Sequence, residues 1–145
     1  MDPYAKLEIN KNKYNIYNLS FNIIKNKLTT MNFACLIDDF EKKLKILNND
    51  KISKFIMIYD MNNMDYNINN SQINEITSLF KKNKSLFENK LLATFIIAND
   101  TFIKTFIKLF KSIYTPMKPL FMNTEIDSVI ENLINNKPNE QEYIL

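Results

Sequence analysis

The stretch Phe55-Ile56-Met57-Ile58-Tyr59-Asp60 is a short, continuous apolar run that ends in a carboxylate. A run of this length without alternation of apolar and polar residues is typical of a central strand that is buried on both faces. Residues 91–98 form a second run of the same character. Strands of this kind belong to sheets that are covered by helices, so the two runs predict an α/β fold.

Helical periodicity fills the segments around these two strands. Thr29 or Thr30 is expected to cap a first helix whose apolar residues recur at spacings of three and four, namely Phe33, Leu36, Ile37, Phe40, Leu44 and Leu47. A second helix is expected to begin at Ser71, a third after the cap residues 99–101, and a fourth at Thr124. A short strand, residues 120–122, precedes the fourth helix. Asn48-Asn49-Asp50 is expected to end the first helix, with Asn in place of Gly in a left-handed cap.

Two alternating segments, residues 4–9 and 14–21, predict an N-terminal hairpin with its loop at residues 10–13. The order of elements predicts right-handed crossovers and a mixed, mostly parallel sheet of four to five strands with an antiparallel N-terminal hairpin and about four helices. A length of 145 residues suits a single domain, which we place at residues 1–137 with a C-terminal tail at 138–145.

The composition excludes several kinds of chemistry. The chain has no Gly, His or Trp, a single Cys, and no Arg, because all 19 basic residues are Lys. Without Gly it cannot form the usual phosphate-binding loops, and without His it lacks the commonest general base and metal ligand. We therefore expect no enzyme activity, no cofactor and no metal. Rich use of Asn, Lys and Ile is typical of an A- and T-rich genome, such as that of a large DNA virus or a parasite.

The arrangement of these segments resembles the STAS superfamily, the sulfate transporter and anti-sigma factor antagonist domains. The resemblance is carried by residues 55–60, by the loop that leads to Ser71, by Leu92-Ala93-Thr94-Phe95-Ile96-Ile97, and by Lys118-Pro119-Leu120-Phe121-Met122-Asn123-Thr124 with the helix that follows. It implies a small, non-enzymatic domain that binds other proteins.

Family members that act as phosphorylation switches carry Asp-Ser-Ser/Thr-Gly at the start of the second helix. This chain has Asn69-Asn70-Ser71-Gln72 there, without Gly and with one hydroxyl. The resemblance therefore makes Ser71 the candidate phospho-switch. Since no Arg is present to bind a phosphate, we expect Ser71 to act mainly as a helix N-cap.

The favoured function is a STAS-like protein-interaction or assembly domain, which could be a subunit of a viral or other multiprotein assembly. The alternative is a small-ligand domain, for a nucleotide or an anion, or a carboxylate-based enzyme. Ligands of open α/β sheets bind at the carboxyl ends of the strands. The residues expected there are Asp60, Asn62, Asn63, Asn99, Asp100, Thr101, Asn123 and Thr124. Of these, Asp60, Asn62, Asn99, Asp100 and Thr101 are the candidate ligand-binding residues. The same residue types are also common as turn and cap residues.

Two segments are candidate interaction surfaces. The expected third helix carries a basic stripe and two apolar residues outside its main apolar arc, and the tail ends in three apolar residues; the set is Lys104, Lys108, Lys111, Phe102, Leu109, Tyr143, Ile144 and Leu145. A net charge of only +3 and the lack of Arg argue against a nucleic-acid partner. We expect protein partners, in a homo- or hetero-oligomer, no transmembrane segment, and a cytoplasmic location, or the virion if the chain is viral.

Overall fold

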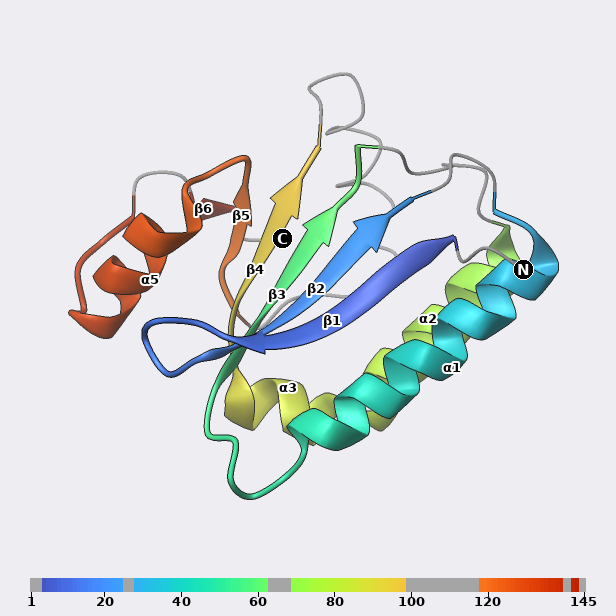
Figure 1. Ribbon diagram of the computed structural model, residues 1–145, viewed down its shortest axis with the longest axis horizontal. Helices are drawn as coiled ribbons and strands as arrows, with labels where there is room; N and C mark the ends of the chain where they lie inside the picture. Colours follow the sequence, from blue (N-terminus) through green and yellow to red (C-terminus); the bar gives the residue numbers. More distant parts are fainter. Residues whose placement is uncertain (1–3, 25–27, 63–68, 99–117, 140–141, 144–145) are drawn as a thin grey trace.

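One sheet with helices on both faces makes up the fold in the computed structural model, which describes residues 4–24, 28–62, 69–98, 118–139 and 142–143 (Figure 1). Its strands are β1 (Ala5–Lys11), β2 (Tyr17–Ile23), β3 (Phe55–Asp60), β4 (Leu91–Ile97), β5 (Leu120–Met122) and β6 (Glu142–Tyr143). The helices in the described segments are α1 (Thr30–Leu47), α2 (Asn70–Lys82), α3 (Lys84–Lys90) and α5 (Ile126–Ile134).

The strands lie in the sheet in the order in which they occur in the sequence, from β1 to β6. β1 and β2 pair antiparallel, β2 to β5 are parallel, and β6 returns antiparallel to β5. The predicted α/β fold with an N-terminal antiparallel hairpin is confirmed. Two elements were not expected, the short helix α3 and the strand β6, which the tail adds to the sheet. The expected third helix lies outside the described residues.

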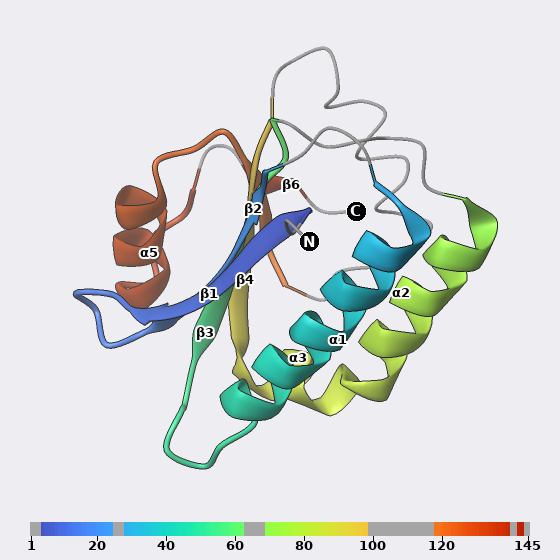
Figure 2. The same ribbon diagram turned by 45° about the vertical axis from the view of Figure 1, so that its right-hand side comes forward.

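Helices α1, α2 and α3 cover one face of the sheet, and α5 covers the other (Figure 2). Right-handed connections between parallel strands that follow one another across a sheet place their helices on the same face, which explains the position of α1 to α3. Each face has its own apolar cluster. On β3, Phe55 and Met57 belong to the cluster under α1 and α2, and Ile56 to the cluster under α5; all three are fully buried, as predicted.

Asn occupies the three described positions with positive φ, Asn15, Asn123 and Asn136. The left-handed cap predicted at the end of the first helix is wrong, because Asn48 ends α1 with a φ of −79°. Asn15 lies in the hairpin turn, where the side chain of Asn12 accepts hydrogen bonds from the backbone N–H groups of Tyr14 (2.9 Å) and Ile16 (3.2 Å). The predicted loop at residues 10–13 is therefore placed too early. β1 continues to Lys11 because the turn is built around the Asn12 side chain.

Of the predicted helix N-caps within the described residues, one is confirmed and two are wrong; the cap predicted at residues 99–101 lies outside them. Thr29 caps α1 and accepts a hydrogen bond from the backbone N–H of Asn32. The N-cap of α2 is Asn69 rather than Ser71, because Asn69 and Gln72 form a reciprocal capping box that satisfies two backbone N–H groups. The N-cap of α5 is Glu125 rather than Thr124, and its side chain makes no capping hydrogen bond.

This capping geometry gives a stability prediction. Replacing Asn69 with Ala should lower the free energy of unfolding by about 0.5–2 kcal/mol, because the N–H of Gln72 loses its acceptor. The matched change Ser71→Ala should alter stability by less than about 0.5 kcal/mol, since Ser71 is exposed and follows the cap. Urea denaturation of both variants measures the difference. A larger loss for Ser71→Ala than for Asn69→Ala would contradict the assignment.

Candidate functional site

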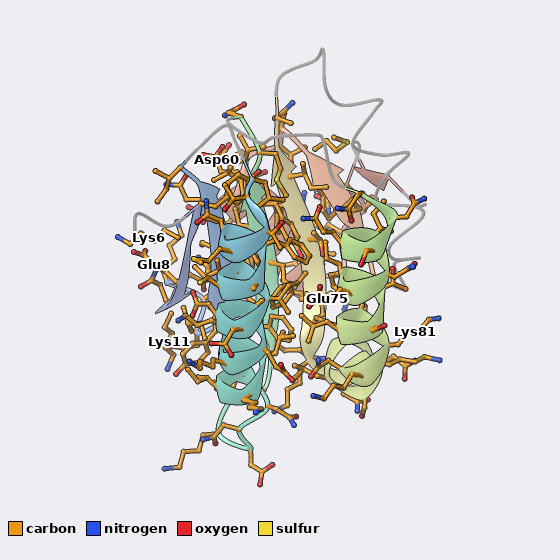
Figure 3. The ribbon with its side chains drawn as sticks, turned by 90° about the vertical axis from the view of Figure 1, so that its right-hand side faces the viewer. Lys6, Glu8, Lys11, Asp60, Glu75 and Lys81 are labelled. Atoms are coloured by element: carbon orange, nitrogen blue, oxygen red, sulfur yellow. The ribbon has the colours of Figure 1, made fainter. Side chains whose placement is uncertain are left out.

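The carboxyl ends of the parallel strands were the predicted ligand site. Asp60 ends β3, as Figure 3 shows, and its carboxylate accepts a hydrogen bond from the backbone N–H of Asn62 at 3.3 Å. These two residues thus come together in a turn, which is an ordinary structural role. Asn99, Asp100 and Thr101 lie outside the described residues, so the structure does not place the other half of this predicted site.

Asn123 has a role at this edge that the sequence did not reveal. Its side-chain Nδ2 donates to the carbonyl of Ala98 (2.7 Å), and its Oδ1 accepts from the N–H of Ala98 (3.0 Å). Its own backbone N–H donates to Ile96 at 2.8 Å. An amide side chain carries both a donor and an acceptor, so it can form the two hydrogen bonds that the N–H and C=O of one more strand residue would form. Asn123 therefore joins the ends of β4 and β5.

A pocket of about 320 Å³ lies beside the start of α5. Its walls come from β5, from α5 and from the segment after α5, and its lining residues are Phe121, Thr124, Glu125, Ser128, Val129, Asn132, Pro138 and Asn139. The hydroxyl of Thr124 is buried and has no hydrogen-bond partner in the described part of the chain. The sequence singled out Thr124 as a helix cap and as one of the strand-end residues, but it did not reveal the pocket, which residues 138–139 help to line.

The candidate switch residue, Ser71, is exposed in the first turn of α2. An exposed hydroxyl near a helix N-terminus is accessible to modification, and a phosphate there would interact favourably with the helix dipole. Phosphorylation of Ser71 remains a prediction.

The structure describes only part of the predicted interaction surfaces. Phe102, Lys104, Lys108, Leu109 and Lys111, together with Ile144 and Leu145, lie outside the described residues. Tyr143 belongs to β6 and pairs with Leu120 of β5. The tail is therefore engaged by the sheet of its own chain at this point.

The outer edge of β1 is a feature that the sequence analysis missed. The backbone N–H of Ile24 donates to the carbonyl oxygen of Tyr4 (2.8 Å), and the backbone N–H of Asn12 donates to the carbonyl oxygen of Ile16 (2.9 Å). In the observed register, Tyr4 pairs with Ile24 and Asn12 pairs with Ile16, and both are hydrogen-bonded pairs. Hydrogen-bonded and non-hydrogen-bonded pairs alternate along an antiparallel ladder. The even-numbered residues of β1 thus bond to β2. The odd-numbered residues direct their N–H and C=O groups away from the sheet; they are Ala5, Leu7, Ile9 and Lys11.

Two charged side chains lie on the face of β1 that points away from α1. The Lys6 Nζ lies 2.8 Å from the Glu8 carboxylate, with 64% and 47% of the two side chains exposed, and Figure 3 shows both projecting away from the helices. Their mutual hydrogen bond is the main reason why the pKa of Lys6 is raised and the pKa of Glu8 is lowered. This face of β1 therefore carries one positive and one negative charge at neutral pH.

Within the described segments, no three His, Cys, Asp or Glu residues gather in a way that could hold a metal ion. In the same segments, no helix has the length and apolar character needed to cross a membrane. In the comparisons with known proteins, no protein family, curated protein or solved structure matches this chain.

Proposed function

We propose that this chain is a non-enzymatic, STAS-like protein-interaction or assembly domain, and that it binds a partner by adding a strand to β1. The observation that carries the proposal is the row of outward-facing backbone groups at Ala5, Leu7, Ile9 and Lys11. A strand that ends a sheet with unpaired N–H and C=O groups is a template for an extended segment of another chain.

Two further features support this proposal. The opposite edge of the sheet already accepts a strand, because β6 pairs antiparallel with β5. Beside β1, Ile24 extends β2 by one residue and is 48% exposed, which provides an apolar contact at the end where a partner strand would pass. The proposal places the chain as a subunit of a larger assembly, in the cytoplasm or in a virion.

Proline at the outer edge gives a direct test. Ile9→Pro should prevent strand addition, since it removes an N–H that faces away from β2. The fold should survive with a loss of about 1–2 kcal/mol, mainly from the half-buried Ile9 side chain. The measurement is cross-linking followed by capture of bound proteins, with urea denaturation to check folding.

The matched control is Asn10→Pro, one residue further along. The N–H of Asn10 faces β2, so this variant should lose a ladder hydrogen bond and be clearly less stable than Ile9→Pro. Equal partner capture by wild type and a folded Ile9→Pro variant would rule out binding at this edge.

A second candidate function is supported by the pocket beside α5. A pocket of about 320 Å³ whose buried Thr124 hydroxyl has no described partner suits a small polar ligand that hydrogen-bonds to that hydroxyl. This is the small-ligand alternative, in a pocket whose lining includes the strand-end residue Thr124 but neither Asp60 nor Asn62.

Thr124→Val distinguishes a ligand-binding hydroxyl from a merely unsatisfied one. Since a buried hydroxyl without a partner destabilises a protein by about 1–3 kcal/mol, the variant should be at least as stable as wild type. In a thermal-shift panel of nucleotides and inorganic anions, a ligand of this pocket should stabilise wild type in a saturable way and the variant much less. If no compound shifts the wild-type melting temperature, the ligand function fails.

A further inference from the structure

We propose that the strand added to β1 is β1 of a second copy of this chain, antiparallel and related by a two-fold axis that passes through Leu7. This inference rests on the proposed interaction function, because it names the partner of the same edge. It follows from the backbone, the charges and the apolar face of β1, in that order.

The backbone is compatible with self-pairing. Since the odd-numbered residues of β1 present their N–H and C=O groups outward, two antiparallel copies bond through these residues alone. With Leu7 on the axis, Leu7 bonds to Leu7 of the second copy, and Ala5 bonds to Ile9 of the second copy. The two-fold symmetry then also pairs Ile9 with Ala5 of the second copy, as an isologous interface requires.

The charges favour this register over the two nearest ones. With Leu7 on the axis, Lys6 lies opposite Glu8 of the second copy, and Glu8 lies opposite Lys6 of the second copy. Opposite charges across a non-hydrogen-bonded pair attract, whereas like charges destabilise the pairing. A shift of the axis to Glu8 would place two Glu8 carboxylates opposite each other, and a shift to Lys6 would do the same for two Lys6 ammonium groups.

From Ala5 to Ile9 the other face of β1 is apolar and would remain covered. Ala5 and Leu7 are buried in the cluster under α1, and Ile9 packs against it, so the new cross-strand neighbours on this face are all apolar. Figure 3 shows β1 to the side of α1 rather than behind it, so α1 leaves the outer edge of β1 accessible. A second strand can therefore extend both the ladder and the apolar layer.

A charge-exchange experiment tests the pairing. Light scattering over a range of concentrations should show a wild-type dimer. Lys6→Glu and Glu8→Lys should each raise its dissociation constant by about tenfold or more, because each places like charges opposite each other twice. An equimolar mixture of the two variants should restore dimers, since every facing pair is then of opposite charge. The matched control Lys11→Glu makes the same charge change on the other face and should leave the dimer intact.

Amide hydrogen exchange supplies a second measurement that does not depend on the variants. The amides of Leu7 and Ile9 should gain protection as the wild-type concentration rises, whereas the amide of Glu8, which faces β2, should be protected at every concentration. A wild type that stays monomeric at its highest soluble concentration, or a dimer unaffected by both charge variants, overturns the inference.

The two proposals can fail separately. If wild type is monomeric but Ile9→Pro still abolishes the capture of other proteins, the interaction function stands and self-pairing is wrong. If wild type is monomeric and Ile9→Pro changes nothing, both proposals are wrong.

Discussion

The central strand β3 must be covered on both faces, and the rest of the fold follows from that constraint. Phe55, Ile56 and Met57 are fully buried, with Ile56 facing the opposite way from its neighbours. Because β2, β3 and β4 follow one another in order, the helices of their two crossovers lie on one face. Among the described helices, α5 covers the other face, and it begins shortly after the positive-φ residue Asn123 at the end of β5. β1 carries exposed charged residues on the α5 side of the sheet, at the end of the strand order far from β5.

Much of this arrangement could be predicted from the sequence, because it depends on local patterns. The apolar run at residues 55–60, the helical spacing in α1 and the Thr29 cap each involve residues within a few positions of one another. The cap of α2 was missed because Asn69, Asn70 and Ser71 are adjacent candidates, and the choice depends on Gln72 reaching back to Asn69. α3 was missed because Asn83 ends one helix and begins the next without a side-chain cap.

The candidate sites were harder to predict, since they depend on which segments meet. The Thr124 hydroxyl, which is buried and has no partner among the described residues, lines a pocket to which Pro138 and Asn139, distant in sequence, also contribute. In the described part of the chain no strand pairs with the outer groups of β1, because β1 is at the end of the strand order, a property of topology that its own alternating sequence does not show. The residue type at the positive-φ positions could be predicted, because a chain without Gly has Asn as its best alternative for a left-handed backbone. Which Asn residues take this conformation, namely Asn15, Asn123 and Asn136, could not.

The charges on β1 bear on how an edge strand avoids unwanted pairing. Charged residues of one sign, Lys above all, protect an edge because two such strands repel each other. Lys6 and Glu8 neutralise each other within one strand at 2.8 Å, and an exposed pair of this kind contributes little to stability by itself. Such a pair repels a second strand only where a charge lies opposite a like charge of that strand. Antiparallel pairing about Leu7 instead places each Lys6 opposite a Glu8 of the other copy. The same two residues therefore discourage pairing about Lys6 or Glu8 and favour pairing about Leu7, which makes the edge of β1 selective rather than closed.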